Sequence, residues 1–145
     1  MTPRSLLAAV ALSTAALVAA QPPAALTVRL TGVPSGEGVV LVAVYASDST
    51  WLDGDAVAYY AEPDAAAGEV VVEIPGVAPG RFAVAAVHDA DASGDMTTGV
   101  FGIPEEAYGF SNGARGTLGP PTFEAAAVLW EGVGELSVEV KKFGG

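Results

Sequence analysis

The chain has 145 residues, with 17 acidic and 6 basic side chains, one His and no Cys. That length suits one domain. The net charge of -11 argues against a nucleic-acid partner, because phosphate binding needs a basic surface. The lack of Cys excludes disulfides, thiol catalysis and Cys-ligated metals, and a single His excludes multi-histidine metal sites.

The first 20 residues are predicted to be a secretion signal. Arg4 supplies a positive start, Leu6–Ala20 is an apolar run, and Val18-Ala19-Ala20 offers the small residues at which signal peptidase cuts. A membrane anchor is the alternative, but the run is shorter than the roughly 20 apolar residues that a span requires. We therefore expect residues 1–20 to be removed on export to the periplasm or the medium.

Residues 21–145 are predicted to form one all-β domain with a net charge of -12. Apolar residues alternate with polar ones at a period of two, and Gly/Pro turns separate the segments. The expected strands are Leu26–Leu30, Val39–Tyr45, Val70–Ile74, Phe82–Val87, Phe123–Trp130 and Leu136–Val140, with a seventh around Ala56–Ala61. The alanines at 125–127 leave a helical turn open as an alternative. Short strands without helical crossovers indicate an antiparallel, immunoglobulin-like β-sandwich.

An acidic loop directly follows the strand that ends at Val87. Its pattern D-x-D-x-S-G-D places Asp89, Asp91 and Ser93 at alternate positions, followed by Gly94 for a sharp turn. Calcium prefers hard oxygen ligands, and loops of this kind present them at positions 1, 3 and 5 and through the carbonyl at position 7, here Asp95. The pattern therefore predicts a Ca²⁺ site.

The loop is not an EF-hand, because Val100 stands where a bidentate Glu is needed and the flanking segments are not helices. Glu105 is the expected further ligand, with Glu106 as the other candidate. An ordinary solvated loop is the alternative, since Asp, Ser and Gly also cap local backbone groups. The five acids between residues 89 and 106 have no Lys or Arg among them, and a cation would relieve their repulsion.

His88 shares a strand face with core residues of the segment Phe82–Val87, which predicts a structural role in orienting the loop. The alternative is a hydrolase in which His88 acts as a base with Asp89 or Glu105. No catalytic constellation is recognisable in the sequence, so the preferred prediction is a protein that is not an enzyme.

Two further segments are candidates for binding. The irregular run Gly99–Asn112 is expected to be pinned to the sandwich by its aromatics, Tyr108 and Phe110 among them. A second acidic block, Asp48–Asp64, interleaves its acids with Trp51, Tyr59 and Tyr60. Aromatics among acids suit a glycan or a cationic ligand in the cell envelope, and packing at a sheet edge is the alternative.

Several motifs occur together in one order: P-G-R-F-A-V at 79–84, H-D at 88–89, G-I-P-E-E-A-Y-G-F-S-N at 102–112 and P-P-T-F-E at 120–124. Over about Leu26–Lys141 the chain resembles the bacterial secreted family catalogued as domain of unknown function 2141. The resemblance implies an N-terminal signal and a transthyretin-like β-sandwich, and it implies no activity. It departs from the family at Thr97 and Ala125, where the family usually carries an Asp.

Overall fold

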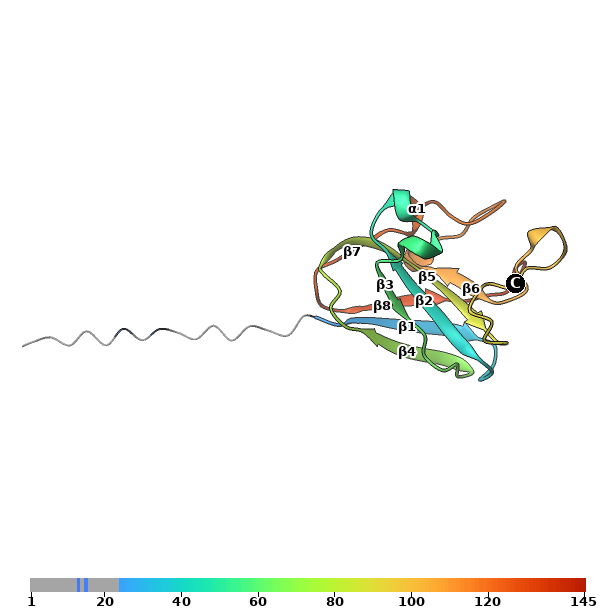
Figure 1. Cartoon of the computed structure of the whole chain (residues 1–145), viewed down its shortest axis with the longest axis horizontal. Helices are drawn as coiled ribbons and strands as arrows, with labels where there is room; N and C mark the ends of the chain where they lie inside the picture. The colour runs from blue at the N-terminus through green and yellow to red at the C-terminus, as the bar shows by residue number, and fades with distance from the viewer. Residues whose placement is uncertain (1–12, 14, 16–23) are drawn as a thin grey trace, which may run out of the picture.

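The computed structural model describes residues 13, 15 and 24–145, so the predicted signal lies almost entirely outside the described residues. From residue 24 onward the chain forms two β-sheets packed face to face (Figure 1). This arrangement confirms the predicted all-β sandwich. The described strands are β1 (Leu26–Val33), β2 (Val39–Tyr45), β3 (Tyr59–Ala61), β4 (Gly68–Ile74), β5 (Gly80–Asp89), β6 (Tyr108–Phe110), β7 (Val128–Trp130) and β8 (Glu135–Glu139).

One sheet has the strand order β4-β1-β8, and the other has the order β3-β2-β5-β6, with β7 also paired to β5. Apolar residues at every second position of β1, β2, β4, β5 and β8 point between the sheets, as a period of two requires. Val40, Val42 and Val44 of β2 and Leu26 and Leu30 of β1 are all fully buried in this core. The β-branched, alternating segments of the sequence therefore became strands because one face of each enters a shared core.

One strand pair differs from the antiparallel arrangement that the sequence predicted. β8 runs parallel to β1, with Val28 opposite Leu136 and Leu30 opposite Val138. Parallel neighbours need a long crossover connection. Here most of the chain lies between them, including the whole second sheet, and periodicity within β8 carries no information about that direction.

The segment Phe123–Trp130 is not one strand. It begins as a helical turn, α1 (Phe123–Ala126), and continues as the short strand β7. The Thr122 hydroxyl accepts a hydrogen bond from the Ala125 N–H at 3.2 Å, which caps the first turn. The helical turn that the alanines allowed is therefore correct for the first half of the segment.

The remaining helical segments are single 3₁₀ turns: η1 (Asp48–Thr50), η2 (Gly54–Ala56), η3 (Val100–Gly102) and η4 (Ser111–Gly113). η2 shortens the expected strand around Ala56–Ala61 to the three residues of β3. In the part of the chain that the structure describes, no helix has the length and apolar character needed to cross a membrane.

β6 was not expected as a strand, and it closes the free edge of β5. Its Tyr108 exchanges two backbone hydrogen bonds with Lys141, at 3.0 and 2.9 Å, which connects β6 to the segment after β8. The approach is close at Gly109, where an added Cβ would lie 2.0 Å from the Glu139 carbonyl oxygen. Only glycine fits between the two backbones at this point.

A second, smaller core covers one end of the outer face of the five-stranded sheet. Phe110, Phe123 and Ala126 are buried there, with Trp51 packed against them. The Trp51 indole N–H donates to the Pro121 carbonyl at 2.8 Å, so the partly buried ring has its polar atom satisfied. The rest of that outer face is left without such a cover.

Replacing Gly109 by Ala tests the close approach of β6 to β8. We expect a loss of about 1–3 kcal/mol in the free energy of unfolding, because a backbone atom must move to admit the methyl group. Gly54→Ala is the matched control, since an added Cβ there meets nothing within 4 Å, and we expect it to stay within about 0.5 kcal/mol of the wild type. Urea unfolding measures both variants, and equal losses would contradict the packing described.

Candidate metal centre

Asp89 is the last residue of β5, and its side chain is fully buried. Its Oδ2 accepts a hydrogen bond from the Gly94 N–H at 2.7 Å, and its Oδ1 accepts from the Ser93 N–H at 3.0 Å and the Ser93 hydroxyl at 3.3 Å. The loop returns to Asp89 through two left-handed positions, Ala92 (φ 52°) and Gly94 (φ 88°). The Gly in the motif therefore serves the turn that brings two N–H groups onto the carboxylate.

The charge on Asp89 is held by these donors. Burial alone would raise its pKa, but hydrogen bonds from Gly94 and Ser93, together with the contact to Asp91, lower the pKa below the ordinary Asp value. Asp89 is thus a buried carboxylate that stays ionised and organises the loop.

Two more carboxylates converge on Asp89. One oxygen from each of Asp89, Asp91 and Glu106 lies within 4.8 Å of the other two. Asp91 is exposed, whereas Glu106 is 8% exposed and reaches the cluster from the segment before β6. Two residues 17 positions apart in the sequence, Asp89 and Glu106, are therefore brought together only by the fold.

Glu106 is the unusual member of the cluster. Its Oε2 accepts the Thr97 N–H at 3.0 Å, but its Oε1 is buried without any hydrogen-bond partner. Burial raises the pKa of Glu106, and the charges of Asp89 and Asp91 raise it further, against the lowering by Thr97. A buried acceptor without a donor is costly in a protein interior, so this oxygen lacks a partner that a cation or water can supply.

The geometry suits a hard cation. Calcium binds oxygens at about 2.3–2.6 Å, so two ligands of one ion lie at most about 5 Å apart. The three carboxylate oxygens, within 4.8 Å of one another, fall inside that limit. A cation at this point would neutralise three like charges and give the unpaired Glu106 oxygen its missing contact.

Of the other predicted ligands, Ser93 and Asp95 lie at the loop, whereas Glu105 lies away from the cluster. The Ser93 hydroxyl contacts Asp89 and also donates to the Asp95 carbonyl at 3.0 Å, so that carbonyl faces the loop interior. Glu105 is exposed, and its carboxylate lies beside Gly99. Glu106, and not Glu105, joins Asp89 and Asp91. Adjacent residues of an extended segment point to opposite sides, and the sequence alone gave no sign of which side would be buried.

His88 has a structural role at the base of the loop. It is 3% exposed, and its Nε2 lies 2.9 Å from the Glu37 carbonyl oxygen in the β1–β2 turn. Gly38 of the same turn packs so closely that an added Cβ would lie 2.1 Å from the Asp89 carbonyl oxygen. Among the described residues, the His88 ring is hydrogen-bonded to neither Asp89 nor Glu105, the partners named in the hydrolase alternative. A cavity of about 260 Å³ borders His88, Glu37 and Glu106.

Ser111 and Asn112 fasten the chain around β6. The buried Ser111 hydroxyl accepts from the Val84 N–H at 2.8 Å and donates to the Ala126 carbonyl. Asn112 adopts a left-handed conformation (φ 57°), and its side-chain amide donates to the Ala125 carbonyl at 2.9 Å. Ala125 therefore belongs to the region of α1, and its lack of a carboxylate does not concern the acidic cluster.

The aromatics of the two candidate segments also divide into packing and exposed groups. Tyr108 and Phe110 stack edge to face, with ring centroids 5.9 Å apart, and both lie in β6, which pairs with β5. Trp51 is part of the second core, and the Tyr59 hydroxyl accepts the Ala78 N–H at 3.3 Å. Tyr60 is half exposed and hydrogen-bonded to Glu62 at 3.1 Å.

Comparison with known proteins gives one match. A family model described as an uncharacterized protein conserved in bacteria, DUF2141, matches residues 28–136. No curated protein and no solved structure matches the chain. The matched range contains Asp89, Asp91 and Glu106, so the whole candidate centre lies within the family's domain.

Replacing Asp89 by Asn tests the carboxylate that organises the loop. In chelator at pH 7 we expect a loss of about 2–3 kcal/mol in the free energy of unfolding, because an Asn amide cannot accept all the donors that now reach the charge. The native pKa lies below the unfolded one, so this stabilisation is present above the unfolded value and is lost as pH falls through the native pKa. The deficit of the variant should therefore shrink below about pH 4.

Asp91→Asn is the matched control, because the exposed Asp91 accepts only one backbone N–H, from Ser93 at 3.2 Å. Urea unfolding at several pH values measures both variants. Equal deficits for Asp89→Asn and Asp91→Asn, or a deficit that does not change with pH, would show that Asp89 does not hold the loop as a charge.

Proposed function

The chain belongs to this uncharacterized bacterial family, DUF2141, and from that premise we propose that it is an exported, non-enzymatic β-sandwich module whose acidic loop binds Ca²⁺. The observation that carries the proposal is the convergence of Asp89, Asp91 and Glu106, with the Glu106 Oε1 buried and without a partner. A solvated loop would leave its carboxylates to water and would not bury two of them beside a third.

Calcium is favoured over other ions by the chemistry of the donors. The cluster offers carboxylate oxygens, with no His or Cys that would select zinc or copper. Three carboxylates leave several positions of a six- to eight-coordinate ion open to water. The cavity of about 260 Å³ beside Glu106 is large enough for such waters. Magnesium demands a tighter octahedral arrangement, which an exposed loop residue such as Asp91 imposes less readily.

The ion would reverse the sign of the Glu106 contribution to stability. Because the native pKa of Glu106 is raised, the protonated side chain is favoured in the folded state, and that stabilisation is lost as pH rises through the native pKa. Above the native pKa and without metal, the ionised Glu106 therefore opposes folding. With a cation bound, the same charge becomes a ligand and stabilises the fold.

The composition of the N-terminal segment supports the export part of the proposal. The apolar segment Leu6–Ala20, after Arg4, has the composition of a secretion signal. Extracellular modules bind calcium weakly, with Kd on the order of 0.1–1 mM, because calcium is abundant outside cells. A chain without Cys has no disulfide to replace that contribution after export.

If the calcium site exists, Glu106→Gln should raise the stability without metal and remove the stabilisation by calcium. About 5 mM Ca²⁺ should stabilise the wild type by about 1–2 kcal/mol relative to chelator, which is roughly 3–10 °C in Tm. Above the native pKa of Glu106, Glu106→Gln should raise the metal-free stability by about 1 kcal/mol, because the uncompensated charge is gone, and it should abolish the calcium shift. Glu105→Gln, at the exposed neighbour, should keep both the wild-type stability and the shift.

Thermal unfolding with chelator, Ca²⁺ and Mg²⁺ measures all three proteins, and isothermal titration gives the affinity. A wild type that shows no shift at several millimolar calcium would remove the proposal. A calcium shift that survives in Glu106→Gln and disappears in Glu105→Gln would move the site to the residue that the sequence first indicated.

Export has its own test. When the full chain is expressed in a bacterium with an intact secretion pathway, the protein recovered from the envelope fraction should begin at Gln21. Mass spectrometry of the purified protein measures this directly. Recovery of a chain that retains Leu6–Ala20 in the membrane fraction would support an anchor, and retention of the uncut chain in the cytoplasm would remove export from the proposal.

A further inference from the structure

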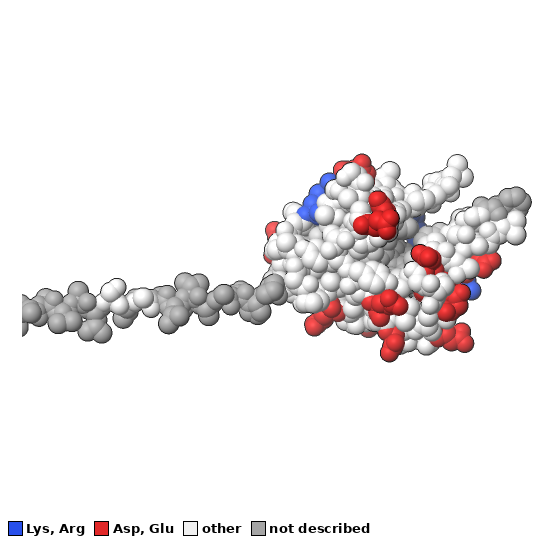
Figure 2. All heavy atoms as spheres, viewed as in Figure 1, with Lys and Arg blue, Asp and Glu red and all other residues white. Residues whose placement is uncertain are grey.

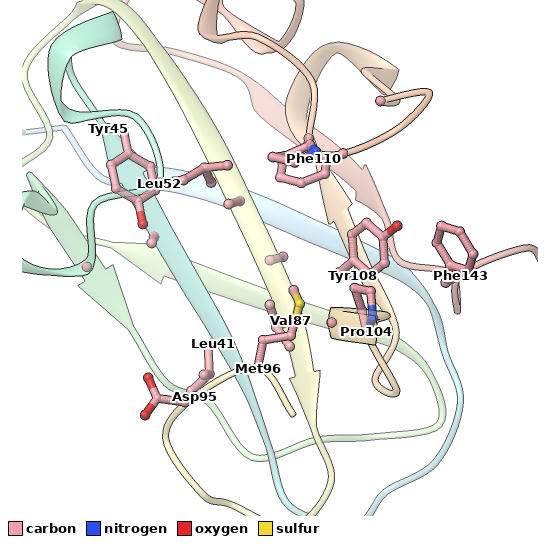
Figure 3. A pocket seen from close by; sticks show the side chains of 18 of the residues that line it. Leu41, Tyr45, Leu52, Val87, Asp95, Met96, Pro104, Tyr108, Phe110 and Phe143 are labelled. Atoms are coloured by element: carbon pink, nitrogen blue, oxygen red, sulfur yellow. The ribbon is translucent and has the colours of Figure 1, made fainter. Parts of the chain in front are cut away.

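A large cavity lies on the outer face of the five-stranded sheet, beside the second core. Phe110 of that core, with Ala85 and Tyr108 packed against it, also lines the cavity. Its volume is about 990 Å³. Leu41 and Tyr45 of β2, Val87 of β5, Tyr108 of β6 and Met96 of the acidic loop point into it (Figure 3). The cavity is therefore built by the same strands that form the core, using the residues between the core positions.

The cavity is deep because its floor is made of alanines. Ala43 of β2 and Ala85 of β5 are register partners at the centre of the sheet, and Ala85 is also opposite Phe110 of β6. Larger side chains stand around this point, and two loops, residues 94–104 and 116–120, supply walls. The volume falls in the range of about 300–1,000 Å³ that is typical of sites for small ligands, and it is mostly apolar as such sites are.

The charge around the cavity is of one sign. Asp95 is the one charged side chain that lines its described walls, and no Lys or Arg does. Acidic side chains far outnumber basic ones on the face shown in Figure 2. Most of the described basic groups are paired elsewhere, Arg29 with Glu69 and Glu135, and Arg81 with Glu124.

The pKa values of two tyrosines of the cavity wall are raised, first by burial and then by nearby carboxylates. Burial, the hydrogen bond to Glu62 and the charges of Glu62, Asp89 and Asp95 raise the pKa of Tyr60 to about 12. Burial and the charge of Asp53 raise the pKa of Tyr45. Both hydroxyls thus lie in a negative potential, which opposes a second negative charge and attracts a positive one.

We propose that this cavity is a binding site for a small amphipathic cation, with the apolar part over Ala43 and Ala85 and the positive group toward Asp95 and Glu62. The apolar part gains by covering sheet surface that is otherwise open to water. The positive group gains from the carboxylates and from aromatic faces, which attract cations as well. An anion of the same shape would meet the same apolar floor and an unfavourable potential.

Three probes with the same eight-carbon chain separate the apolar contribution from that of charge. They are octyltrimethylammonium, octyl glucoside and octanoate, each kept below its critical micelle concentration. By isothermal titration in low salt we expect the cation to bind roughly 3- to 30-fold tighter than octanoate, with the neutral glucoside between them. At about 0.5 M salt the differences should narrow, because exposed charges are screened.

Three variants test the placement. Ala43→Phe fills the floor and should weaken binding of all three probes by about tenfold or more. Val71→Phe is the matched control, since Val71 is half exposed on β4 of the other sheet, and it should bind like the wild type. Asp95→Asn should reduce the preference for the cation and leave octyl glucoside binding unchanged, without a change in Tm, because Asp95 is exposed.

Several results would overturn the proposal. Equal affinity for the three probes would show an apolar surface without charge selection. Tighter binding of octanoate would show that the cavity prefers an anion. Unchanged binding in Ala43→Phe would place the probes elsewhere. Concentration-dependent dimerisation of the wild type that Ala43→Phe abolishes would identify a second copy of the chain as the occupant. Because Glu106→Gln leaves the cavity lining intact, failure of the calcium site and failure of this site give different results.

Discussion

Strand β5 must be hydrogen-bonded along both edges, and the rest of the fold is arranged around that requirement. It is buried in the centre of its sheet, where an unpaired N–H is costly. On one edge, every residue of β2 from Val39 to Tyr45 has a partner in β5. The other edge is shared by β6 and β7, and between them the Ser111 hydroxyl accepts the Val84 N–H. The need to pair this edge therefore gives Gly109 and Ser111, both in the family-matched range, their structural roles.

The same strand positions both candidate sites. Residues of β5 that face inward complete the core, those that face outward form the cavity floor, and its last residue, Asp89, anchors the acidic loop. That loop connects the sites, because Asp89 and Asp91 hold the metal centre while Asp95 and Met96 line the cavity wall. Order imposed on the loop by an ion would therefore also fix one wall of the cavity.

The sequence predicted the strands that follow from local residue patterns. It missed the features that depend on pairing between segments remote in the chain. Alternation placed β1, β4 and β8, because one buried face is enough to produce it, and continuous apolar runs placed β2 and β5. The three-residue strand β6 has a Gly at its centre and no alternation, so only the approach to β8 makes it a strand. The parallel direction of β8 and the choice of Glu106 over Glu105 likewise depend on neighbours that are remote in the chain.

The acidic excess of the chain has a local origin. Ten of the 17 acids lie in the two blocks 48–64 and 89–106, which contain no basic residue. Acids outside the blocks, such as Glu69, Glu135 and Glu139, form ion pairs with Arg29, Arg115 or Lys141. In the second block, Asp89, Asp91 and Glu106 accept backbone N–H groups, and Glu106 keeps one oxygen without any donor. A charge needed only for solubility could be paired or exposed. Charge that is buried without a basic partner is more economically explained by ligands that supply the positive charge themselves.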